Sequence, residues 1–269
     1  MDGKTAVVIG GASGIGWATA RLLHTRGATV VIADIDGRAA RARAGELGNG
    51  ARASTADVTD ESSVESLFAD VVASEGAPDT IVECAGVSMP GRITDLALED
   101  WRTTVDVCLT GAFLVMKHAG RVVRDGGSIT TIASLNGRQP APGMAAYCAA
   151  KAGVLMLTEV AALELGARGV RVNAVSPGLV DTPLTAGVAL VPGLREDYLE
   201  NTPLGRAGRP EEVAEVVAFL ASDAATWMTG ATIDLNGGAH TRRYPDLLAH
   251  LAAMASPHEA VPGATNPGT

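Results

Sequence analysis

The chain opens with a short β-prone run, a glycine turn and a helix-prone stretch in immediate succession. Residues 5–9 read Thr-Ala-Val-Val-Ile, residues 10–16 read Gly-Gly-Ala-Ser-Gly-Ile-Gly, and residues 17–26 have a helical composition. Glycines let a backbone turn tightly and approach a pyrophosphate, and the amides at the start of the following helix attract its negative charge. This order predicts a strand, a turn and a helix that together bind a dinucleotide.

A second apolar run strengthens this interpretation. Residues 29–33 read Thr-Val-Val-Ile-Ala and are followed by Asp34, whose carboxylate can accept hydrogen bonds from a ribose hydroxyl. A glycine motif alone is weak evidence, and the alternative is a plain tight turn with a surface aspartate. The acid at the end of the second run favours the dinucleotide.

Strand-like and helix-like segments alternate along the rest of the chain. The expected later strands are 51–55, 80–84, 128–132, 171–175 and 232–235, and the expected helices are 61–75, 98–124, 145–165 and 210–221. Such alternation predicts parallel βαβ units with right-handed crossovers. The expected fold class is α/β: a single-domain, doubly wound Rossmann fold whose parallel seven-stranded sheet carries helices on both faces. The domain should span residues 1–239, with a substrate lid at about 183–205 and a partly mobile C-terminal extension at 240–269.

Composition limits the partners and the compartment. The chain has 269 residues, of which 47% are hydrophobic, and a formal charge of -9, so one sizeable core fits and nucleic acid or an anionic membrane is not expected as a partner. Three widely spaced cysteines, Cys84, Cys108 and Cys148, indicate reduced thiols in a cytoplasmic protein and no metal site. The first strand begins four residues from Met1, so we expect neither a signal peptide nor a membrane span.

Tyr147 and Lys151 lie four residues apart in the expected helix 145–165, on one helical face. A nearby ammonium favours the phenolate, which moves a tyrosine toward use as an acid or base. The alternative is a structural pair on a helix surface. Ser134 follows the expected strand 128–132, at the edge where open α/β sheets bind ligands, although a serine there can simply cap a turn.

With these motifs assembled, residues 4–238 resemble the short-chain dehydrogenase/reductase family. Further matches at the family's spacing are Asp57-Val58, Ala85-Gly86, the run 173–178 (Asn-Ala-Val-Ser-Pro-Gly) and the run 203–206 (Pro-Leu-Gly-Arg). The resemblance implies an NAD-dependent oxidoreductase that interconverts a secondary alcohol and a ketone, assembled as a homotetramer on the helical segments 98–124 and 145–165. An alternative is a dinucleotide-binding sensor or scaffold with little turnover.

The resemblance also implies roles for individual residues. Ser134 would hold the substrate oxygen, Tyr147 would be the general acid/base, and Lys151 would lower the tyrosine pKa and bind the nicotinamide ribose. The residues implied to bind NAD are Gly10, Ser13, Gly14, Ile15, Gly16, Asp34, Asp57, Val58, Ala85, Gly86, Tyr147, Lys151, Pro177, Gly178, Val180 and Thr182. Asp34 should repel the 2′-phosphate of NADP, with Arg38 as the nearby cation that opposes this preference.

The lid and the C-terminal segment bear on the substrate. The lid side chains are Leu184, Val188, Leu190, Val191, Leu194 and Tyr198, which suggest a neutral, hydrophobic alcohol or ketone, while Arg138 and Arg195 leave an acidic group possible. The run 247–254 is too short for a stable isolated helix. We expect its leucines Leu247, Leu248 and Leu251 to pack on the same or a neighbouring subunit near a substrate entrance, and the segment after Pro257 to be mobile.

Three positions depart from the family pattern. Ile9 replaces a threonine, Glu83-Cys84 replaces a pair of asparagines, and Cys108 replaces an asparagine that supports a proton-carrying water. A carboxylate in a central strand is costly, so Glu83 should find a donor or have a raised pKa. Cys108 either alters the proton path or is simply a small buried residue.

Overall fold

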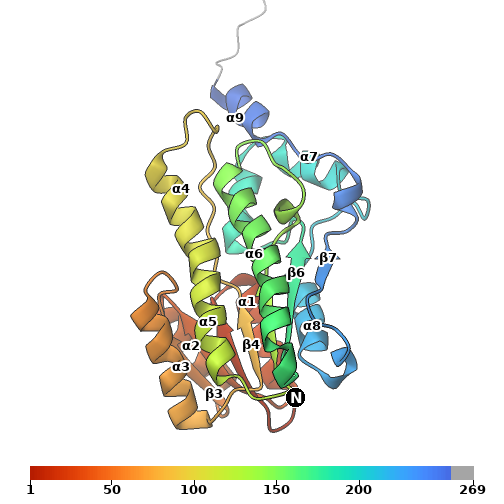
Figure 1. Cartoon of the computed structure of the whole chain (residues 1–269). Coiled ribbons are helices and arrows are strands. Elements are labelled where there is room, and N and C mark those ends of the chain that lie inside the picture. The colour runs from red at the N-terminus through yellow and green to blue at the C-terminus, as the bar shows by residue number, and fades with distance from the viewer. Residues whose placement is uncertain (256–269) are drawn as a thin grey trace, which may run out of the picture.

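The computed structural model describes residues 1–255, which fold around one parallel sheet of seven strands in the order β3-β2-β1-β4-β5-β6-β7 (Figure 1). The strands are β1 (Thr5–Ile9), β2 (Thr29–Asp34), β3 (Ala51–Thr55), β4 (Thr80–Glu83), β5 (Ser128–Ile132), β6 (Arg171–Pro177) and β7 (Thr232–Leu235). The predicted fold class is therefore confirmed. The division into a domain at 1–239 and an extension at 240–269 stays a prediction.

Helices connect the strands and continue past the last one. The α-helices are α1 (Gly14–Thr25), α2 (Gly37–Leu47), α3 (Glu61–Glu75), α4 (Leu98–Val105), α5 (Gly111–Val122), α6 (Ala145–Leu165), α7 (Leu194–Glu200), α8 (Pro210–Leu220) and α9 (Leu247–Ala255). The shorter turns are the π-helix η1 (Asp106–Thr110) and the 3₁₀-helices η2 (Leu135–Gly137), η3 (Gly166–Arg168), η4 (Pro183–Leu190), η5 (Asp223–Ala225) and η6 (Ala239–Thr241).

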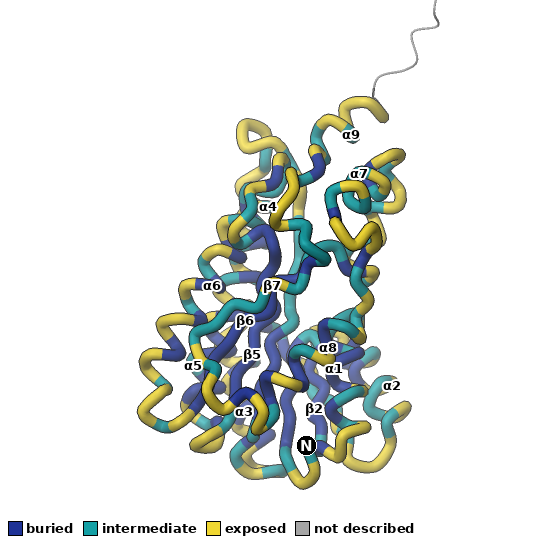
Figure 2. Tube along the Cα trace, turned by 90° about the vertical axis from the view of Figure 1, so that its right-hand side faces the viewer, coloured by how far each residue is buried: buried dark blue, intermediate teal, exposed yellow. Residues whose placement is uncertain are grey.

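The alternation of side chains along β1 explains why both faces of the sheet are covered. Val7 and Ile9 point into the core beneath α3, α5 and α6, whereas Ala6 and Val8 point into the core beneath α1 and α8. A strand that is apolar on both faces is typical of a parallel sheet between helical layers. Figure 2 shows the strands as a buried centre with exposed outer surfaces on the helices.

Two helical boundaries differ from the sequence-based expectation. The first helix begins at Gly14 rather than at residue 17, because the glycine turn itself closes the first helical turn, although glycine has a low helix propensity. The expected single helix 98–124 is α4, η1 and α5, so one π-helical turn, Asp106–Thr110, interrupts it. Such turns often lie at functional sites, and this one contains Cys108.

Helix α6 carries the Tyr147–Lys151 pair and is unusually apolar. By length and composition, Ala145–Arg168 is the one candidate membrane span among the described residues, with a mean hydropathy of 1.4, and 44% of its most apolar window is buried inside the protein. The core helix of an α/β protein passes the same test. Here the inner face of α6 packs on β6, and Thr158 bonds to Thr131 of β5 across 3.1 Å.

The order of the strands places a crevice between β1 and β4. The chain runs outward from β1 to β3 and then crosses back to β4 on the other side of β1. Open α/β sheets bind ligands at such a reversal, outside the carboxyl ends of the strands. The loops after β1, β4, β5 and β6, which carry most of the predicted site residues, all end at this edge, and α7 and α9 lie beyond it (Figure 1).

Candidate active site

The glycine turn after β1 is packed so closely that side chains do not fit in it. A Cβ atom added at Gly16 would lie 2.1 Å from the carbonyl oxygen of Gly10, and Gly14 has a φ of +50° beside Thr182. Gly16 requires glycine because a substituent would displace backbone, and Gly14 favours glycine because its φ is positive. The resulting bare start of α1 is a cradle of the kind that accommodates a pyrophosphate.

A cavity of about 150 Å³ lies directly over this turn. Its lining contains the predicted residues Gly10, Ser13, Gly14, Ile15, Gly16, Gly86, Ser134, Tyr147, Lys151, Pro177, Gly178, Val180 and Thr182. Asp34, Asp57, Val58 and Ala85 do not line it, although they follow or end β2, β3 and β4 at the same edge of the sheet. The lining also contains Leu184, predicted only as a lid residue, and five residues that the sequence analysis did not predict there: Cys84, Ile132, Ala133, Pro183 and Thr185.

Lys151 is only 3% exposed and is held at the base of this cavity. Its Nζ donates to the carbonyl oxygen of Ile132 across 2.7 Å and lies 5.7 Å from the centre of the Tyr147 ring. Burial by itself lowers the pKa of Lys151, but the facing groups of Tyr147, Cys108 and Glu83 together raise it. The ammonium therefore stays charged next to the phenol.

The pKa of Tyr147 differs from the expectation. Burial of the hydroxyl raises this pKa, while Lys151 and a hydrogen bond with Ser134 lower it, and burial outweighs both. The physical reason is that a phenolate in a nearly dry site loses more hydration than one ammonium replaces. The lysine thus acts in the predicted direction, but the net shift is upward, so the site needs a further positive charge to favour the phenolate.

Ser134 caps a turn, which is one of the two roles weighed for it, and it also lines both cavities. Its Oγ accepts from the backbone N–H of Asn136 across 3.1 Å and thereby caps η2, and its hydroxyl faces that of Tyr147 and acts to lower the pKa of the tyrosine. Its carbonyl oxygen accepts from the hydroxyl of Ser176 in β6. The serine is 8% exposed, so its hydroxyl is held in place at the end of β5.

A second, larger cavity of about 360 Å³ adjoins the first. The two cavities share Ser134, Tyr147, Pro177, Gly178, Leu184 and Thr185, whereas Lys151 lines only the smaller one. The lid residues Leu184, Val188, Val191, Leu194 and Tyr198 line the larger cavity, as expected. Leu190 does not, because it points outward and is 78% exposed.

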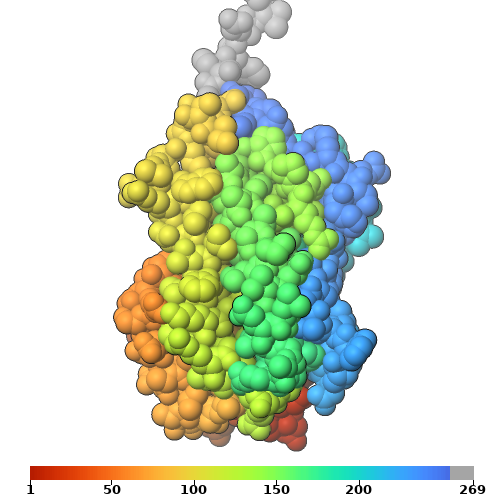
Figure 3. Space-filling model, viewed as in Figure 1, coloured from red at the N-terminus to blue at the C-terminus, as the bar shows by residue number. Residues whose placement is uncertain are grey.

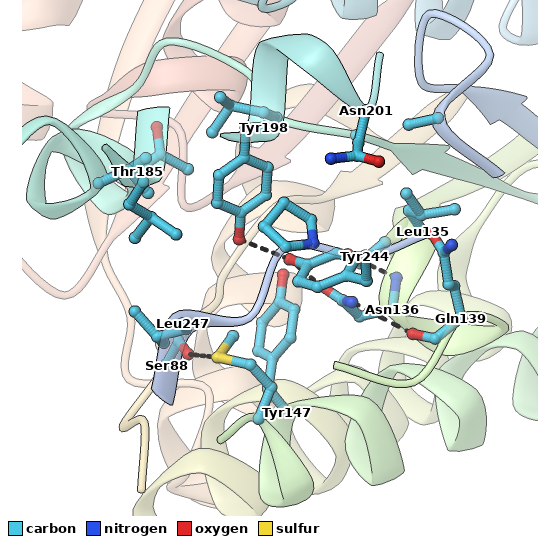
Figure 4. A pocket seen from close by; sticks show the side chains of 18 of the residues that line it. Ser88, Leu135, Asn136, Gln139, Tyr147, Thr185, Tyr198, Asn201, Tyr244 and Leu247 are labelled. Atoms are coloured by element: carbon cyan, nitrogen blue, oxygen red, sulfur yellow. Dashed lines mark hydrogen bonds between the residues drawn. The ribbon is translucent and has the colours of Figure 1, made fainter. Parts of the chain in front are cut away.

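The C-terminal segment completes this larger cavity. Leu247 and Leu251 of α9 line it, and Leu248 packs on Gly143 of the same chain, which agrees with the expected docking near a substrate entrance. The expected mobility after Pro257 lies outside the described residues. Tyr244 also lines the cavity and was missed, although it is one of only three tyrosines in the chain, all of which converge here (Figure 4).

The two arginines that left an acidic substrate possible are engaged elsewhere. Arg138 pairs with Asp234, and Arg195 pairs with Asp181. Neither of these arginines lines either cavity.

Glu83 was expected either to find a hydrogen-bond donor or to have a raised pKa, and it has both. Its side chain is fully buried, its Oε1 accepts from the backbone N–H of Ala85 across 2.7 Å, and its Oε2 has no partner among the described residues. Burial raises the pKa of Glu83 to about 7, against a smaller lowering by Lys151. It stands opposite Ile9 in the β1–β4 register, so the apolar neighbour offers it no hydrogen bond.

Cys108 is buried in the π-helical turn, and its thiol both donates a hydrogen bond to the backbone of Val87 and accepts one from it. Its Sγ donates to the carbonyl oxygen of Val87 across 3.2 Å and accepts from the N–H of Val87 across 3.4 Å. A Cβ added at Gly86 would lie 3.8 Å from both this sulfur and the Lys151 ammonium. The thiol therefore lies next to the lysine and also ties the loop after β4 to the helix.

Comparison with known proteins agrees with this geometry. A family model described as enoyl-(acyl carrier protein) reductase matches residues 10–240. The chain is 45% identical over 240 residues to cis-4-hydroxycyclohexanecarboxylate dehydrogenase from Sinomonas cyclohexanicum, covering 87% of this chain and 96% of that protein. It is 41% identical over 245 residues to D-threitol dehydrogenase from Mycolicibacterium smegmatis, covering 88% and 93%.

A solved structure shows the same fold. The short-chain type dehydrogenase/reductase from Mycobacterium ulcerans superposes with a TM-score of 0.90 at 38% identity, over 94% of this chain and 95% of that one. Sequence similarity at this level over nearly the whole length, together with the shared sheet and the Ser134–Tyr147–Lys151 geometry, leads to one assignment. The chain belongs to the short-chain dehydrogenase/reductase family.

Proposed function

We propose that this protein is an NAD-dependent oxidoreductase that interconverts a secondary alcohol and a ketone. The observation that carries the proposal is the junction of the two cavities, because Ser134 and Tyr147 line both of them. A substrate in the larger cavity and a dinucleotide in the smaller one would meet at these two hydroxyls. The names of the relatives, which are dehydrogenases of hydroxylated compounds, support the same reaction class.

The residues around the smaller cavity fit a nicotinamide dinucleotide. The amides of the bare turn at 10–16 would hold the pyrophosphate, Asp34 the adenosine ribose, and Asp57 and Val58 would border the adenine. Tyr147 and Lys151 would bind the nicotinamide ribose, with Val180 and Thr182 at the carboxamide end. When bound, the oxidised cofactor supplies a hydride acceptor and a positive charge.

Side chains of the protein would then bind the substrate oxygen and transfer its proton. Ser134 holds the substrate oxygen by a hydrogen bond, and Tyr147 Oη takes the hydroxyl proton during oxidation or returns it during reduction. The Lys151 ammonium stabilises the phenolate that forms. Because Tyr147 is neutral in the resting site, its acid form is ready for ketone reduction, and its base form requires the added positive charge described above.

A screen of dinucleotide reduction with cyclic, aliphatic and steroidal secondary alcohols tests the proposal. Tyr147→Phe should lower kcat by about two orders of magnitude or more on any accepted alcohol, since it deletes the acid/base, while the Kd for NAD changes little. Turnover by Tyr147→Phe at the parent rate would refute the catalytic assignment. Tight NAD binding with no turnover of any alcohol would favour the sensor or scaffold instead.

We further propose NAD as the preferred cofactor. The Asp34 carboxylate accepts from the backbone N–H groups of Ala12 and Asp36, each across 3.0 Å, so it is fixed beside the glycine turn as an anion that repels a 2′-phosphate. Arg38 lies in the first turn of α2 and is the cation that opposes this preference. Equal kcat/KM values with NAD and NADP would contradict the proposal.

A homotetramer in the cytoplasm is the proposed state of the protein. Figure 3 shows α5 and α6 side by side on one face of the molecule, and these two helices expose Phe113, Met156 and Leu163 by 47%, 60% and 84%. Apolar exposure of this kind favours burial against another copy. All three cysteines are free thiols, which suits a reducing compartment. Light scattering that showed only a monomer would exclude the assembly.

A further inference from the structure

The distal end of the larger cavity carries a short chain of hydrogen bonds between tyrosines. The hydroxyl groups of Tyr198 and Tyr244 lie 2.7 Å apart, and the Tyr244 hydroxyl bonds to Asn136 Oδ1 across 3.1 Å (Figure 4). The two rings meet edge to face, with centroids 5.5 Å apart. Tyr198 comes from the lid helix α7 and Tyr244 from the segment before α9, so two remote parts of the chain build this polar end.

The donor and the acceptor in each of these hydrogen bonds can be assigned by starting from Asn136. Asn136 Nδ2 donates to the carbonyl oxygen of Gln139, and a carbonyl only accepts, so the other amide atom of Asn136, facing Tyr244, must be the oxygen. Tyr244 therefore donates its proton to Asn136. Its oxygen is then the acceptor for Tyr198, which must donate to it. Both phenolic protons are therefore used in hydrogen bonds within the protein. The two hydroxyl oxygens can only accept a hydrogen bond from a ligand in the cavity.

The neighbouring amide side chains are oriented in the same sense. Asn201 Nδ2 donates to the carbonyl oxygen and to Oδ1 of Asp197, across 2.8 and 2.9 Å. Gln139 Nε2 donates to the carbonyl oxygen of Arg242 across 2.6 Å, and its Oε1 has no partner among the described residues but is buried out of reach of the cavity. Both residues line the cavity. The amide nitrogens are thus engaged by protein, and the Asn201 amide is left with its oxygen, an acceptor.

The cation at this end is also engaged. Arg243 lines the cavity, but its guanidinium pairs with Asp197, which in turn accepts from His250 across 3.2 Å. An anionic substrate group would compete with a carboxylate already in place and would face phenolic and amide oxygens. The phenolic and amide oxygens at this end can only accept hydrogen bonds, so it calls for a ligand that donates them.

We propose that the substrate is a diol: one hydroxyl lies at Ser134 and Tyr147, and a second hydroxyl donates to the acceptor oxygens of Tyr198 and Tyr244. The inference rests on the proposed alcohol oxidation and specifies its substrate class. The apolar side chains between the two ends, including Leu184 and Val188, would contact the carbon skeleton. A monoalcohol would leave the distal acceptors without a donor from the substrate. A hydroxy acid would bring a carboxylate toward oxygen atoms that cannot donate to it.

A comparison of turnover between matched ring substrates tests this proposal. The measured quantity is kcat/KM with NAD for cyclohexanol, for the 1,2-, 1,3- and 1,4-cyclohexanediols, for cis-4-hydroxycyclohexanecarboxylate and for 4-aminocyclohexanol. The best diol should exceed cyclohexanol roughly tenfold or more, because a site built to bind a hydroxyl discriminates strongly against its absence. The hydroxy acid should fall below cyclohexanol. A preference for the acid or the amine over every diol would overturn the inference.

A variant of the distal end separates recognition from a general effect on the lid. Tyr198→Phe removes one acceptor oxygen, so the ratio of kcat/KM between the best diol and cyclohexanol should fall about tenfold. Arg195→Gln is the matched control, because Arg195 is on the same helix but pairs with Asp181 outside the cavity. That ratio should keep its parent value in the control. An equal fall in both variants would show that lid packing, not the acceptor, sets the ratio.

The outcomes distinguish this inference from the proposed function. Turnover of cyclohexanol with no gain for any diol leaves the oxidoreductase standing and removes the diol proposal. If no alcohol is turned over, the proposed function fails, and calorimetric titration of the protein with NAD present decides the inference by itself. Tighter binding of a diol than of cyclohexanol would then retain it, and equal binding would reject it.

Discussion

The two adjoining cavities differ in the parts of the chain that form their walls. The smaller one is walled mainly by a continuous glycine turn and by residues at or just after strand ends, together with Tyr147 and Lys151 of α6 and the first residues of the lid. The larger one is walled mainly by the loops after β4, β5 and β6, by Tyr147 of α6, by the lid and by the segment 239–251. Backbone and glycine geometry leave little freedom in the first cavity, whereas the shape and polarity of the second depend on which side chains meet there.

This contrast explains how one fold serves many substrates. The half that would hold a common dinucleotide is part of the sheet edge and changes only if the fold changes. The half that would hold the substrate is added by loops and by the C-terminal segment, which can vary while the sheet stays intact. Substitutions in the two halves should therefore differ in the size and kind of their effects.

The largest effect is expected in the glycine turn. Gly16→Ala places a Cβ atom 2.1 Å from the Gly10 carbonyl oxygen, so the start of α1 must move. A displacement of about 1 Å can cost roughly 100-fold in catalysis, and we expect a loss of that order in kcat/KM for NAD. Gly45→Ala is the control, because Gly45 has open space in α2 and should be neutral or slightly stabilising. Equal losses in both variants would contradict the cradle.

The next effect concerns the buried carboxyl below the smaller cavity. The pKa of Glu83 is raised from 4.5 to about 7, so the folded protein holds this proton more tightly than the unfolded chain does. Its contribution to stability is complete below about pH 4.5 and is lost as the pH rises through about 7.

Glu83→Gln should therefore gain in stability relative to the parent between these two pH values, levelling off at about 3 kcal/mol, since one pKa unit corresponds to about 1.4 kcal/mol. Urea denaturation at pH 5 and pH 8 measures it. A difference between the two proteins that does not change with pH would mean that Glu83 titrates normally.

A smaller effect, confined to the substrate side, is expected from Asp197→Ala. Asp197 joins α7 to the C-terminal segment through Arg243 and His250, and these bonds outweigh burial and lower its pKa. Their loss should loosen the lid and raise the substrate KM several-fold, while the Kd for NAD stays at the parent value. Asp181→Ala, which breaks only the exposed pair with Arg195, is the control. A matching rise in the NAD Kd would show that the two cavities are not independent.

The smallest effect is expected at Cys108. If its thiol is a poor partner for water near Lys151, Cys108→Asn should raise kcat at neutral pH about two- to threefold, or lower the pH at which kcat levels off, without altering NAD affinity. The sulfur's two bonds to Val87 are the reason to expect a modest change. An unaltered pH profile of kcat would identify Cys108 as a packing residue.

The sequence by itself determined the fold, the order of strands and helices, and most of the smaller cavity. It could do so because those features rest on local patterns: a glycine turn between a strand and a helix, apolar runs of strand length, and residues placed directly after them. Even Glu83 was identifiable, since a carboxyl within an apolar strand requires either a donor or a proton.

Only the tertiary structure decided the larger cavity and the balance of charge in the site. Tyr198, Tyr244 and Asn136 are separated by 46 to 108 residues, and no local pattern indicates that their side chains share hydrogen bonds. The pKa of Tyr147 likewise depends on how burial compares with one ammonium, and the outward turn of Leu190 depends on how the lid packs. Periodicity specifies which face of an element is buried, but the contacts between remote segments arise only when the chain has folded.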